Sequence, residues 1–386
     1  MASADFGHEP LQAWLVSTRC VACMSNVYAV ILAGGSGTRF WPASRRLRPK
    51  QLLPIAPGSD EALIRSTARR LTALIPTERI LVSTNAALLE ATRAALPDIP
   101  AENFLAEPAP RNTAPCIGWA NSVIARRDPK AVMAVLPSDH HIADEPAFVS
   151  MLTEAIQSAQ AGVVTTIGVE PTRPETGYGY IEVGAPLLGR TFRVKRFVEK
   201  PDRAKAQEYL LQGNYLWNSG MFFFRVDILG AAIQSHMPEL DTGLRQIEAA
   251  FAQGPSAYAQ TLERVFPHLP SISIDYGVIE KESELNVVRG GFGWSDLGSW
   301  PSVWELSAQD SDGNAVTPTT LLVDSHRNLV QSMQTGGSKR IMALVGIDDL
   351  CIIETDDACL ILPRERAQDV RAVVELLKEK GRQDLL

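Results

Sequence analysis

The feature that most constrains this chain is a short apolar run that ends in glycines. Residues 27–33 read VYAVILA and lead directly into GGSGTR at 34–39. A continuous apolar run of this length before a turn signal is typical of a strand buried on both faces of a parallel sheet. Similar runs alternate with helical patterns further along, with runs at 80–83, 131–136 and 163–169 and helical patterns at 88–95, 115–127 and 148–161. This alternation predicts an α/β fold with a doubly wound, mostly parallel sheet.

The second half of the chain changes in texture twice. From about residue 177 the segments are aromatic and β-rich, with helical patterns at 204–211 and 228–251. Beyond residue 298, short β-type pieces recur at near-regular spacing and are followed by an amphipathic helical pattern at 368–380. We therefore predict a main domain over 24–300 and a small C-terminal β-rich segment, in the manner of a solenoid, over 301–386.

Charge and cysteine content exclude several classes of protein. The chain of 386 residues has 37 Lys+Arg against 44 Asp+Glu, a formal net charge of −7, whereas a dedicated nucleic-acid binder is basic. No stretch approaches the roughly 20 apolar residues that a membrane span needs. The five cysteines are too few and too scattered for a disulfide framework, so we expect a cytoplasmic protein.

The first 23 residues differ in character from the rest of the chain. They begin MASADFGHEP, without the positive charge and apolar core of a secretory signal. Cys20 and Cys23 form a lone CxxC, and without a second ligand pair this does not indicate a zinc site. Met24 has the look of a natural beginning, because a short polar stretch and then the first strand come directly after it. We expect residues 1–23 to be a disordered, dispensable extension.

The glycine-rich turn after the first strand could hold phosphate. Backbone amides in such a turn can approach a phosphate closely. The spacing fits neither the dinucleotide fingerprint, since Phe40 stands at the last glycine position, nor the P-loop. A plain connecting turn and a solvated basic face are the alternatives. The combination of turn and cations favours a polyphosphate group, the cations being Arg39, Arg45, Arg46, Arg48 and Lys50.

Two aspartates are candidate metal ligands. Asp139 follows the run at 131–136, at the edge where open α/β sheets bind ligands, and Asp296 lies in another glycine-flanked loop. Nucleotide-bound Mg²⁺ takes one or two protein carboxylates and completes its shell with phosphate oxygens and water. Either aspartate alone could equally cap a turn.

Polar side chains in the β-rich half could bind hydroxyl groups. Asn218, in WNSG, and Glu182 can each hydrogen-bond several hydroxyls, as a sugar site requires. Lys200 ends a β-type segment, and Pro201 fixes the chain after it. None of the three is diagnostic by itself, because a lone lysine is most often solvated.

Several long strings, taken together, resemble those of the mannose-1-phosphate guanylyltransferase family of sugar-nucleotide pyrophosphorylases. They are LAGGSGTRFWPA from Leu32, PKQ from Pro49, EPAPRNTAP from Glu107, LPSDHH from Leu136, ETGYGYIE from Glu175, FVEKP from Phe197, LWNSGMFF from Leu216, SIDYGVIEK from Ser273 and GWSDLGSW from Gly293. The match runs from about residue 26 to the end of the chain. The chain is similar to the bacterial form of the family that has no fused isomerase domain.

The resemblance implies a Rossmann-like nucleotide-diphospho-sugar transferase domain and a C-terminal segment like a left-handed β-helix. It also implies that a sugar 1-phosphate oxygen attacks the α-phosphorus of a nucleoside triphosphate in line, with positioning and charge neutralisation doing nearly all the work. The expected substrates are GTP and mannose 1-phosphate, and the expected products are GDP-mannose and pyrophosphate. The expected cofactor is Mg²⁺ and the expected assembly a homodimer, with neither nucleic acid nor a membrane as partner.

The resemblance assigns roles residue by residue. The expected catalytic residues are Arg39, Lys50, Asp139 and Lys200, and the expected Mg²⁺ ligands are Asp139 and Asp296. Sugar and sugar phosphate are expected at Gly177, Tyr178, Glu182, Lys200 and Asn218, although Tyr178 could equally be core. The expected nucleotide contacts, with Asn112 and Thr113 at the guanine edge, are Leu32, Ala33, Gly34, Gly35, Gly37, Thr38, Arg39, Lys50, Asn112, Thr113 and Asp139.

Three alternatives stay open at the level of sequence. The first is a pyrophosphorylase for another sugar or base, since only the RNTAP and WNSG strings argue for guanine and mannose. The second is a catalytically silent relative that binds GDP-mannose and regulates a partner, although such a protein should have lost the charged residues needed for turnover. The third is a Rossmann dehydrogenase, which the missing third glycine and the absent acidic partner disfavour.

Overall fold

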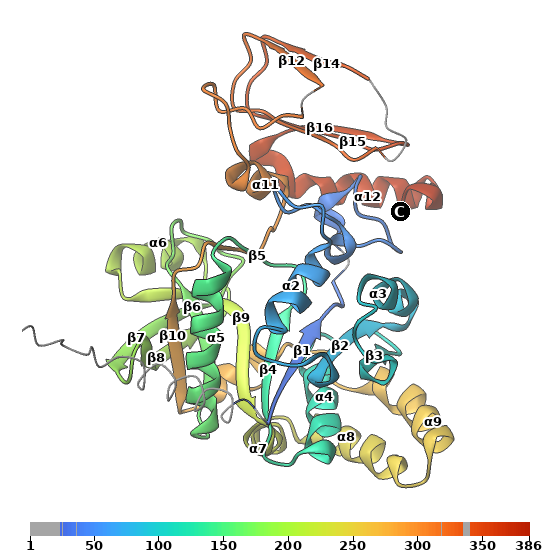
Figure 1. Ribbon diagram of the computed structural model, residues 1–386, viewed down its shortest axis with the longest axis vertical. Coiled ribbons are helices and arrows are strands. Elements are labelled where there is room, and N and C mark those ends of the chain that lie inside the picture. The colour runs from blue at the N-terminus through green and yellow to red at the C-terminus, as the bar shows by residue number, and fades with distance from the viewer. Residues whose placement is uncertain (1–23, 25, 36, 318, 335–339) are drawn as a thin grey trace, which may run out of the picture.

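A nine-stranded sheet with helices on both faces forms the body of the molecule. A smaller β-unit lies beyond the ends of its strands, at the top of Figure 1. The computed structural model describes residues 24–386 except 25, 36, 318 and 335–339. The expectations for residues 1–23, the CxxC pair among them, therefore lie outside the described residues.

The large sheet has the strand order β3-β2-β1-β4-β9-β6-β10-β8-β7. Its pairings make seven strands run in one direction, with β9 and β8 reversed. The predicted doubly wound, mostly parallel sheet is confirmed. The strands are β1 (Val27–Leu32), β2 (Ile80–Asn85), β3 (Phe104–Glu107), β4 (Val132–Pro137), β6 (Val164–Val169), β7 (Tyr180–Pro186), β8 (Thr191–Val198), β9 (Tyr215–Arg225) and β10 (Leu285–Gly290).

Side chains of the sheet alternate between two cores. In β1, Ala29 and Ile31 belong to the core under α2 (Leu63–Leu71) and α5 (Glu145–Gln160), whereas Val30 belongs to the core on the opposite face. This follows from the two-residue period of a strand. The opposite face is covered by α4 (Thr113–Arg127), α7 (Val226–His236) and α8 (Pro238–Phe251). The other helices of the body are α3 (Leu89–Ala95), α6 (Arg203–Gln212), α9 (Pro255–Val265) and α10 (Ile274–Gly277).

The single helix predicted over 228–251 is wrong, because the structure has two helices there. α7 ends at His236, Met237 leaves the helical region with φ −138°, and Pro238 opens α8. A proline lacks the backbone N–H that continuing the helix would need and restricts the residue before it, so it starts a new helix instead. Of the helices described, none has the length and apolar character for a bilayer crossing.

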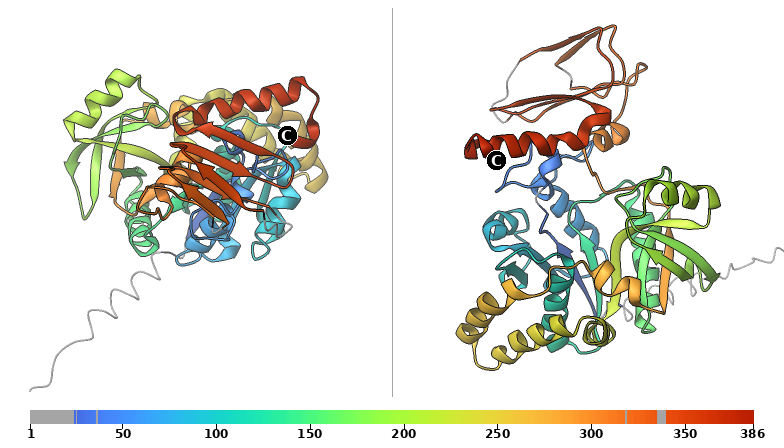
Figure 2. Two further views of the ribbon diagram at one scale, coloured as in Figure 1. Left: turned by 90° about the horizontal axis from the view of Figure 1, so that it is seen from above. Right: turned by 180° about the vertical axis from the view of Figure 1, so that it is seen from behind.

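The C-terminal unit is a short β-coil (Figure 2). β12 pairs in parallel with β14 and β13 with β15, and in both cases the partners are 22 residues apart, since Thr320 pairs with Met342 and Leu329 with Cys351. A constant offset in two parallel ladders means that successive turns of the chain stack on one another, as the predicted β-helix-like segment requires. The strands are β12 (Thr320–Val323), β13 (Leu329–Ser332), β14 (Met342–Val345), β15 (Leu350–Glu354) and β16 (Cys359–Pro363).

The C-terminal unit is fastened to the segment that comes after the glycine-rich turn. Figure 1 shows α12 (Val370–Glu379) between the C-terminal strands and this early segment. Phe40 and Trp41 share one apolar core with Trp300, which opens α11 (Trp300–Leu306), and with Val374 of α12. Trp41 Nε1 donates to the carbonyl of Leu385 at 2.9 Å. The C-terminal unit thereby supports the segment between the turn and Lys50.

Candidate active site

The glycine-rich turn is built around Lys50. Gly37 has φ 60°, in the left-handed region, and a Cβ on it would lie 2.6 Å from the Cβ of Lys50. Only glycine tolerates both the backbone angle and the close approach. Gln51 holds the turn by donating from Nε2 to the carbonyls of Ala33 and Gly35, at 2.9 and 3.2 Å. Gly37 and Gln51 therefore hold the described part of the turn against the short helix of Lys50–Leu52.

Lys50 joins the two aspartates that the sequence singled out. Its Nζ donates to Asp139 Oδ2 at 2.9 Å and to the backbone carbonyl of Asp296 at 2.5 Å. Asp139 follows β4, and Asp296 follows β11 (Trp294–Ser295), which pairs with β5 (His141–Ile142). Burial opposes ionisation of Asp139, but the Lys50 ammonium outweighs it and holds the pKa of that carboxyl below its ordinary value.

Two further groups meet at Asp296. Tyr178 donates its hydroxyl to Asp296 Oδ1 at 2.6 Å, while its ring packs edge-on against Trp217 and Trp294. Arg39 and Asp296 both border Gly298. Predicted nucleotide and sugar residues therefore converge on one carboxylate.

The donor set fits a hard divalent cation that is shared with a phosphate. Asp139 and Asp296 supply carboxylate oxygens, and Mg²⁺ in nucleotide sites takes one or two such groups. No cluster of three or more His, Cys, Asp or Glu side chains suited to a metal occurs in the described part of the chain. A cation held here would need oxygens from a bound phosphate to complete its shell.

A second polar cluster lies where β8 ends, beside β9 and α10. Lys200 Nζ donates to Glu199 Oε1 at 2.6 Å, and Asn218 Nδ2 donates to Asp275 Oδ1 at 3.0 Å. Glu199 Oε2 is buried and has no hydrogen-bond partner within the described residues. Burial, with the nearby charge of Glu199, raises the pKa of Asp275 to about 6. The cluster therefore offers more acceptors than the protein itself satisfies.

The backbone of the 177–179 segment lies directly against this cluster. Asn218 N donates to the Gly179 carbonyl at 2.8 Å, and a Cβ on Gly179 would lie 2.5 Å from Glu199 Oε2. Gly177 N donates to Glu175 Oε1 at 3.0 Å. Because Tyr178 stands between the two glycines, one short segment joins the polar cluster to Asp296.

The structure does not bring Glu182 to the cluster where the sequence analysis expected it. Its carboxylate accepts from Lys195 Nζ at 2.6 Å and from the Tyr215 hydroxyl at 3.1 Å, and Arg196 lies 3.4 Å away. These partners hold the carboxylate against β8 and β9. The carboxylates beside Gly179 and Asn218 are instead Glu199 and Asp275, so the sugar contact at Glu182 stays a prediction, with Glu199 as the alternative carboxylate.

On the other side of Asp139, a cavity of about 680 Å³ is bounded by the turn, Asp139 and the RNTAP segment. Four of the residues predicted to contact the nucleotide line it, namely Leu32, Ala33, Gly34 and Gly35. Asn112 and Thr113 open α4, where Asn112 Oδ1 accepts from the Thr113 N–H and Thr113 Oγ1 accepts from the Ile274 N–H, both at 2.9 Å. Both side chains thus hold the helix start as well as the cavity wall.

The sequence analysis did not single out three carboxylates of the candidate site. Glu107 lines the cavity, and Glu199 and Asp275 form the polar cluster. All three lie within strings that carry the family resemblance, EPAPRNTAP, FVEKP and SIDYG, and that was the available signal. Nothing in these strings, however, distinguishes the acidic residue from its neighbours as a candidate ligand contact.

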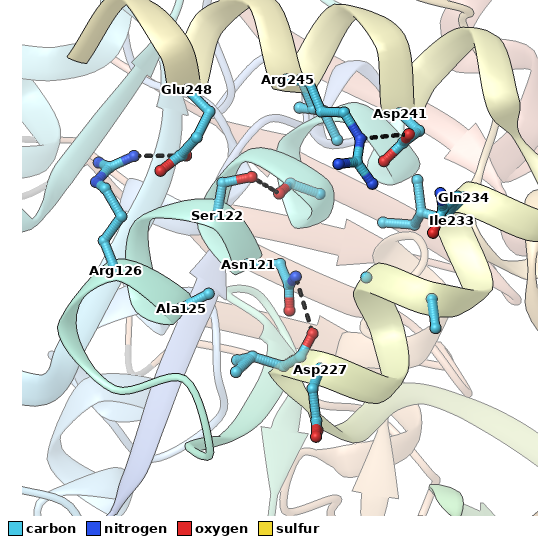
Figure 3. A pocket seen from close by; sticks show the side chains of 15 residues that line it. Asn121, Ser122, Ala125, Arg126, Asp227, Ile233, Gln234, Asp241, Arg245 and Glu248 are labelled. Carbon is cyan, nitrogen blue, oxygen red and sulfur yellow. Dashed lines mark hydrogen bonds and ion pairs between the residues drawn. The ribbon is translucent and has the colours of Figure 1, made fainter. Parts of the chain in front are cut away.

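Another pocket opens at α4, α7 and α8, at the far end of the sheet (Figure 3). Its arginines are already paired, Arg126 with Glu248 and Arg245 with Asp241, both at 2.7 Å. None of the residues that line it belongs to the strings that carry the family resemblance. The pocket is therefore unlike the cleft beside the glycine-rich turn.

Comparison with known proteins agrees with the geometry. Residues 28–313 match the model of the nucleotidyl transferase family, and residues 319–377 match that of the MannoseP isomerase/GMP-like beta-helix domain. The chain therefore belongs to the nucleotidyl transferase family. Its two matched parts and its relatives place it in the mannose-1-phosphate guanylyltransferase branch, whose enzymes make GDP-mannose.

Three relatives illustrate the likeness. The chain is 38% identical over 362 residues to the xanthan biosynthesis protein XanB of Xanthomonas campestris pv. campestris (strain B100), covering 94% of this chain and 75% of that one. It is 36% identical over 367 residues to the mannose-1-phosphate guanylyltransferase of Escherichia coli (strain K12), covering 93% and 75%. A crystal structure from Thermus thermophilus, described as a mannose-1-phosphate geranyltransferase, aligns with a TM-score of 0.81 at 34% identity over 92% of this chain and 99% of that one.

Proposed function

We propose that the chain transfers the guanylyl group of GTP to mannose 1-phosphate, with Mg²⁺ bound, and releases GDP-mannose and pyrophosphate. The observation that carries the proposal is the placement of Lys50, Asp139 and Asp296. They are joined by hydrogen bonds, Asp139 borders the cavity, and Asp296 accepts from Tyr178 of the segment that lies against the polar cluster of Glu199, Lys200, Asn218 and Asp275. A nucleotide and a sugar phosphate would meet at these three residues.

The protein's part in the reaction is to bind, orient and neutralise charge. A phosphate oxygen of mannose 1-phosphate forms a bond to the α-phosphorus of GTP, and the bond to the β-phosphate oxygen breaks, so that pyrophosphate carries away the electron pair. Arg39, Lys50 and the amides of the turn face the triphosphate, and Lys200 faces the attacking phosphate. Fixed cations of this kind stabilise charge as it shifts without having to reorganise.

The metal would be held by Asp139 and Asp296. When bound, it supplies additional positive charge at the phosphate oxygens. Lys50 keeps both groups in place, because its one ammonium contacts the carboxylate of Asp139 and the main chain of Asp296. The side chain of Asp296 is oriented in turn by the Tyr178 hydroxyl.

The test is pyrophosphate release by the purified protein over a grid of nucleoside triphosphates and sugar 1-phosphates, with and without Mg²⁺. We expect release with GTP plus mannose 1-phosphate and Mg²⁺, and none from Asp139→Asn. Release with a different pair would keep the mechanism and change the substrates. Binding of GDP-mannose without release from any pair would instead indicate the regulatory alternative.

We further propose a homodimer that forms through the C-terminal coil. Leu321, Val323 and Val345 lie on neighbouring strands β12 and β14 and are each more than half exposed, at 58%, 59% and 65%. Apolar side chains gathered on one exposed face are typical of an association surface. Light scattering should give twice the chain mass, and Val323→Lys with Val345→Lys should give the monomer mass.

A cytoplasmic location is part of the same proposal. The cysteines of the described residues, Cys116, Cys351 and Cys359, are free thiols, and the first two are buried. Free thiols are typical of a reducing compartment. Fractionation of expressing cells should find the protein with soluble cytoplasmic markers.

A further inference from the structure

Trp294 links the two loops that carry the aspartates of the proposed metal site, and no role has yet been given to it. Its indole Nε1 donates to His140 Nδ1 at 3.1 Å, and the two rings pack edge-on with their centroids 5.3 Å apart. His140 is the residue after Asp139, and Trp294 comes two residues before Asp296. One side-chain hydrogen bond therefore joins the neighbours of two ligand candidates that are far apart in the chain.

Backbone pairing does not extend as far as the two aspartates. β5 and β11 pair over only two residues each, and the pair nearest the aspartates is His141 with Ser295. In this register the next pair would be His140 with Asp296, but the ladder stops before it. The separation of the two aspartates therefore depends on side-chain contacts beyond the end of a very short ladder.

The backbone next to Asp296 is in a conformation that needs support. Leu297 has φ 44°, in the left-handed region that residues other than glycine rarely adopt. Such strain persists only where the surrounding structure fixes it, and it is concentrated at functional sites. Leu297 is completely buried, and its N–H donates to Ser295 Oγ at 3.1 Å. Asp296 is thus held from both directions, by a core residue after it and by Trp294 before it.

Lys50 also joins the two aspartates, but its contacts would change when ligands bind. Its ammonium is expected to face the phosphates of the nucleotide, and a metal cation would compete with it for the carboxylate of Asp139. The hydrogen bond between Trp294 and His140 uses no group that we expect to face phosphate or metal. It can therefore stay in place throughout binding, which the contacts of Lys50 cannot.

Further contacts favour a single position for the indole. The ring of Trp294 packs edge-on against that of Tyr178, with centroids 5.5 Å apart, and Tyr178 in turn donates its hydroxyl to Asp296. The backbone of His140 is held as well, since its carbonyl accepts from Arg70 Nη1 at 3.4 Å. Rotation of the indole would break contacts to both loops.

We propose that Trp294 is a positioning residue for the metal site. Through its hydrogen bond to His140, it sets the separation of the two aspartates that Mg²⁺ requires. The inference rests on the proposed function, since it concerns the cation of that same site. Mg²⁺ demands a nearly regular octahedron of oxygens and tolerates little change in ligand spacing. Groups that orient metal ligands from behind typically account for about 10- to 100-fold in metal affinity.

The test measures metal binding in variants that lose one hydrogen bond. Trp294→Phe keeps an aromatic ring and removes the N–H. Trp304→Phe is the matched control, because its N–H donates to the carbonyl of Gly313, which belongs to neither aspartate loop. Binding of Mn²⁺ in the presence of GDP-mannose, followed by electron paramagnetic resonance, reports on the site without turnover. We expect the Kd for Mn²⁺ to rise roughly 10-fold in Trp294→Phe and to stay within about twofold in Trp304→Phe.

Kinetics separate positioning of the metal from a general loss of structure. In Trp294→Phe we expect the Mg²⁺ concentration for half-maximal rate to rise about 10-fold. The kcat at saturating Mg²⁺ and the KM for mannose 1-phosphate should change by less than about threefold. The melting temperature without metal should fall no further than that of Trp304→Phe. A loss of kcat that saturating Mg²⁺ does not restore would overturn the proposal.

A second variant tests whether Trp294 acts through His140. His140→Leu removes the acceptor and should by itself weaken Mn²⁺ binding as much as Trp294→Phe does. The double variant should be no weaker than either single one, since both changes break the same bond. Losses that multiply would contradict this, and so would an unchanged Kd in either single variant. Because the Mn²⁺ titration needs no reaction, it distinguishes a failure of this inference from a failure of the proposed function.

Discussion

The candidate site has a phosphate end and a sugar end, and the charged side chains at the two ends are paired differently. At the phosphate end, the Lys50 ammonium pairs with the Asp139 carboxylate and also donates to the backbone carbonyl of Asp296, so Lys50 and Asp139 are matched before any ligand arrives. At the sugar end, Glu199 and Asp275 lie close together with Lys200 as the nearby cation, and one carboxylate oxygen of Glu199 has no partner among the described residues. The pKa shifts follow the same division, lowered for Asp139 and raised for Asp275.

The difference corresponds to what each end would bind. Phosphates bring negative charge, so their site needs fixed cations that are themselves held in place. A sugar brings hydroxyl donors, so its site can keep unsatisfied acceptors that become satisfied on binding. Substitutions at the two ends should therefore affect different kinetic constants.

The largest effect should come from the aspartates between the two ends. Asp139→Asn or Asp296→Asn removes a charge from the proposed metal site, and we expect kcat to fall about 10³-fold. The fold should survive, with an unchanged circular dichroism spectrum. If both variants kept near-normal rates at limiting Mg²⁺, the metal assignment would be wrong and the matched-charge view of this end would fail with it.

Rigidity of the phosphate end can be tested at its glycines. Gly37→Ala forces a side chain into a left-handed backbone and against Lys50, which costs about 1 kcal/mol in backbone strain alone and displaces the lysine. We expect kcat/KM for GTP to drop by about 10² with a lowered melting temperature. Gly291→Ala is the control, since a Cβ there would meet nothing within 4 Å and the residue does not line the cavity beside Asp139. Equal behaviour of the two variants would show that the turn does not position Lys50.

The sugar end can be tested with a pair of glutamates. Glu199→Gln should raise KM for mannose 1-phosphate by roughly 10-fold with a smaller change in kcat, because a charged hydrogen bond to the sugar is weakened. Glu182→Gln should leave KM within about twofold, since its carboxylate is engaged by Lys195 and Tyr215. Steady-state kinetics with varied sugar phosphate gives both numbers. The reverse ranking would restore Glu182 as the sugar contact.

Glu107, in the wall of the cavity beside Asp139, can be tested through the pH dependence of stability. Because the pKa of Glu107 is raised to about 7 in the folded chain, the folded state holds more protons than the unfolded state between the ordinary value of 4.5 and 7. Stability from this group is therefore present at low pH and declines as pH rises through that window. Glu107→Gln should lose this decline and be more stable than the natural protein at pH 8, by up to about 3 kcal/mol. Thermal unfolding at pH 5 and pH 8, with Glu102→Gln as control, checks the sign.

The smallest change in activity and stability should result from deleting residues 1–23. We assign no residue of this segment to the candidate site. We expect kcat, KM and the melting temperature to stay close to those of the whole chain. A lower melting temperature together with lost turnover would show that this segment packs on the domain.

Local patterns predicted most of the elements correctly. The apolar runs became β1, β2, β4 and β6, since a short apolar run with a turn signal at its end has few other ways to bury its side chains. The break at Pro238 was missed, although the residue was visible, because apolar periodicity continues across it. Asp139 and Lys50 could be chosen because each stands beside a strand end or a proline in a long, specific string.

Tertiary structure decided which partners each acid has. Glu182 lies two residues from the buried Tyr180 in β7, so the strand period directs it to the same packed face, where Tyr215 reaches it. Glu199 follows the end of β8 and reaches Gly179 and Asn218 through strand pairing that no local pattern encodes. Sequence by itself determined the elements, the phosphate turn and the family, because these depend on neighbours along the chain. The approach of Glu199 to Gly179 and of Asp275 to Asn218, like the place of Glu107 in the cavity wall, depends on contacts between residues far apart in the chain, and only the packed fold brings those residues together.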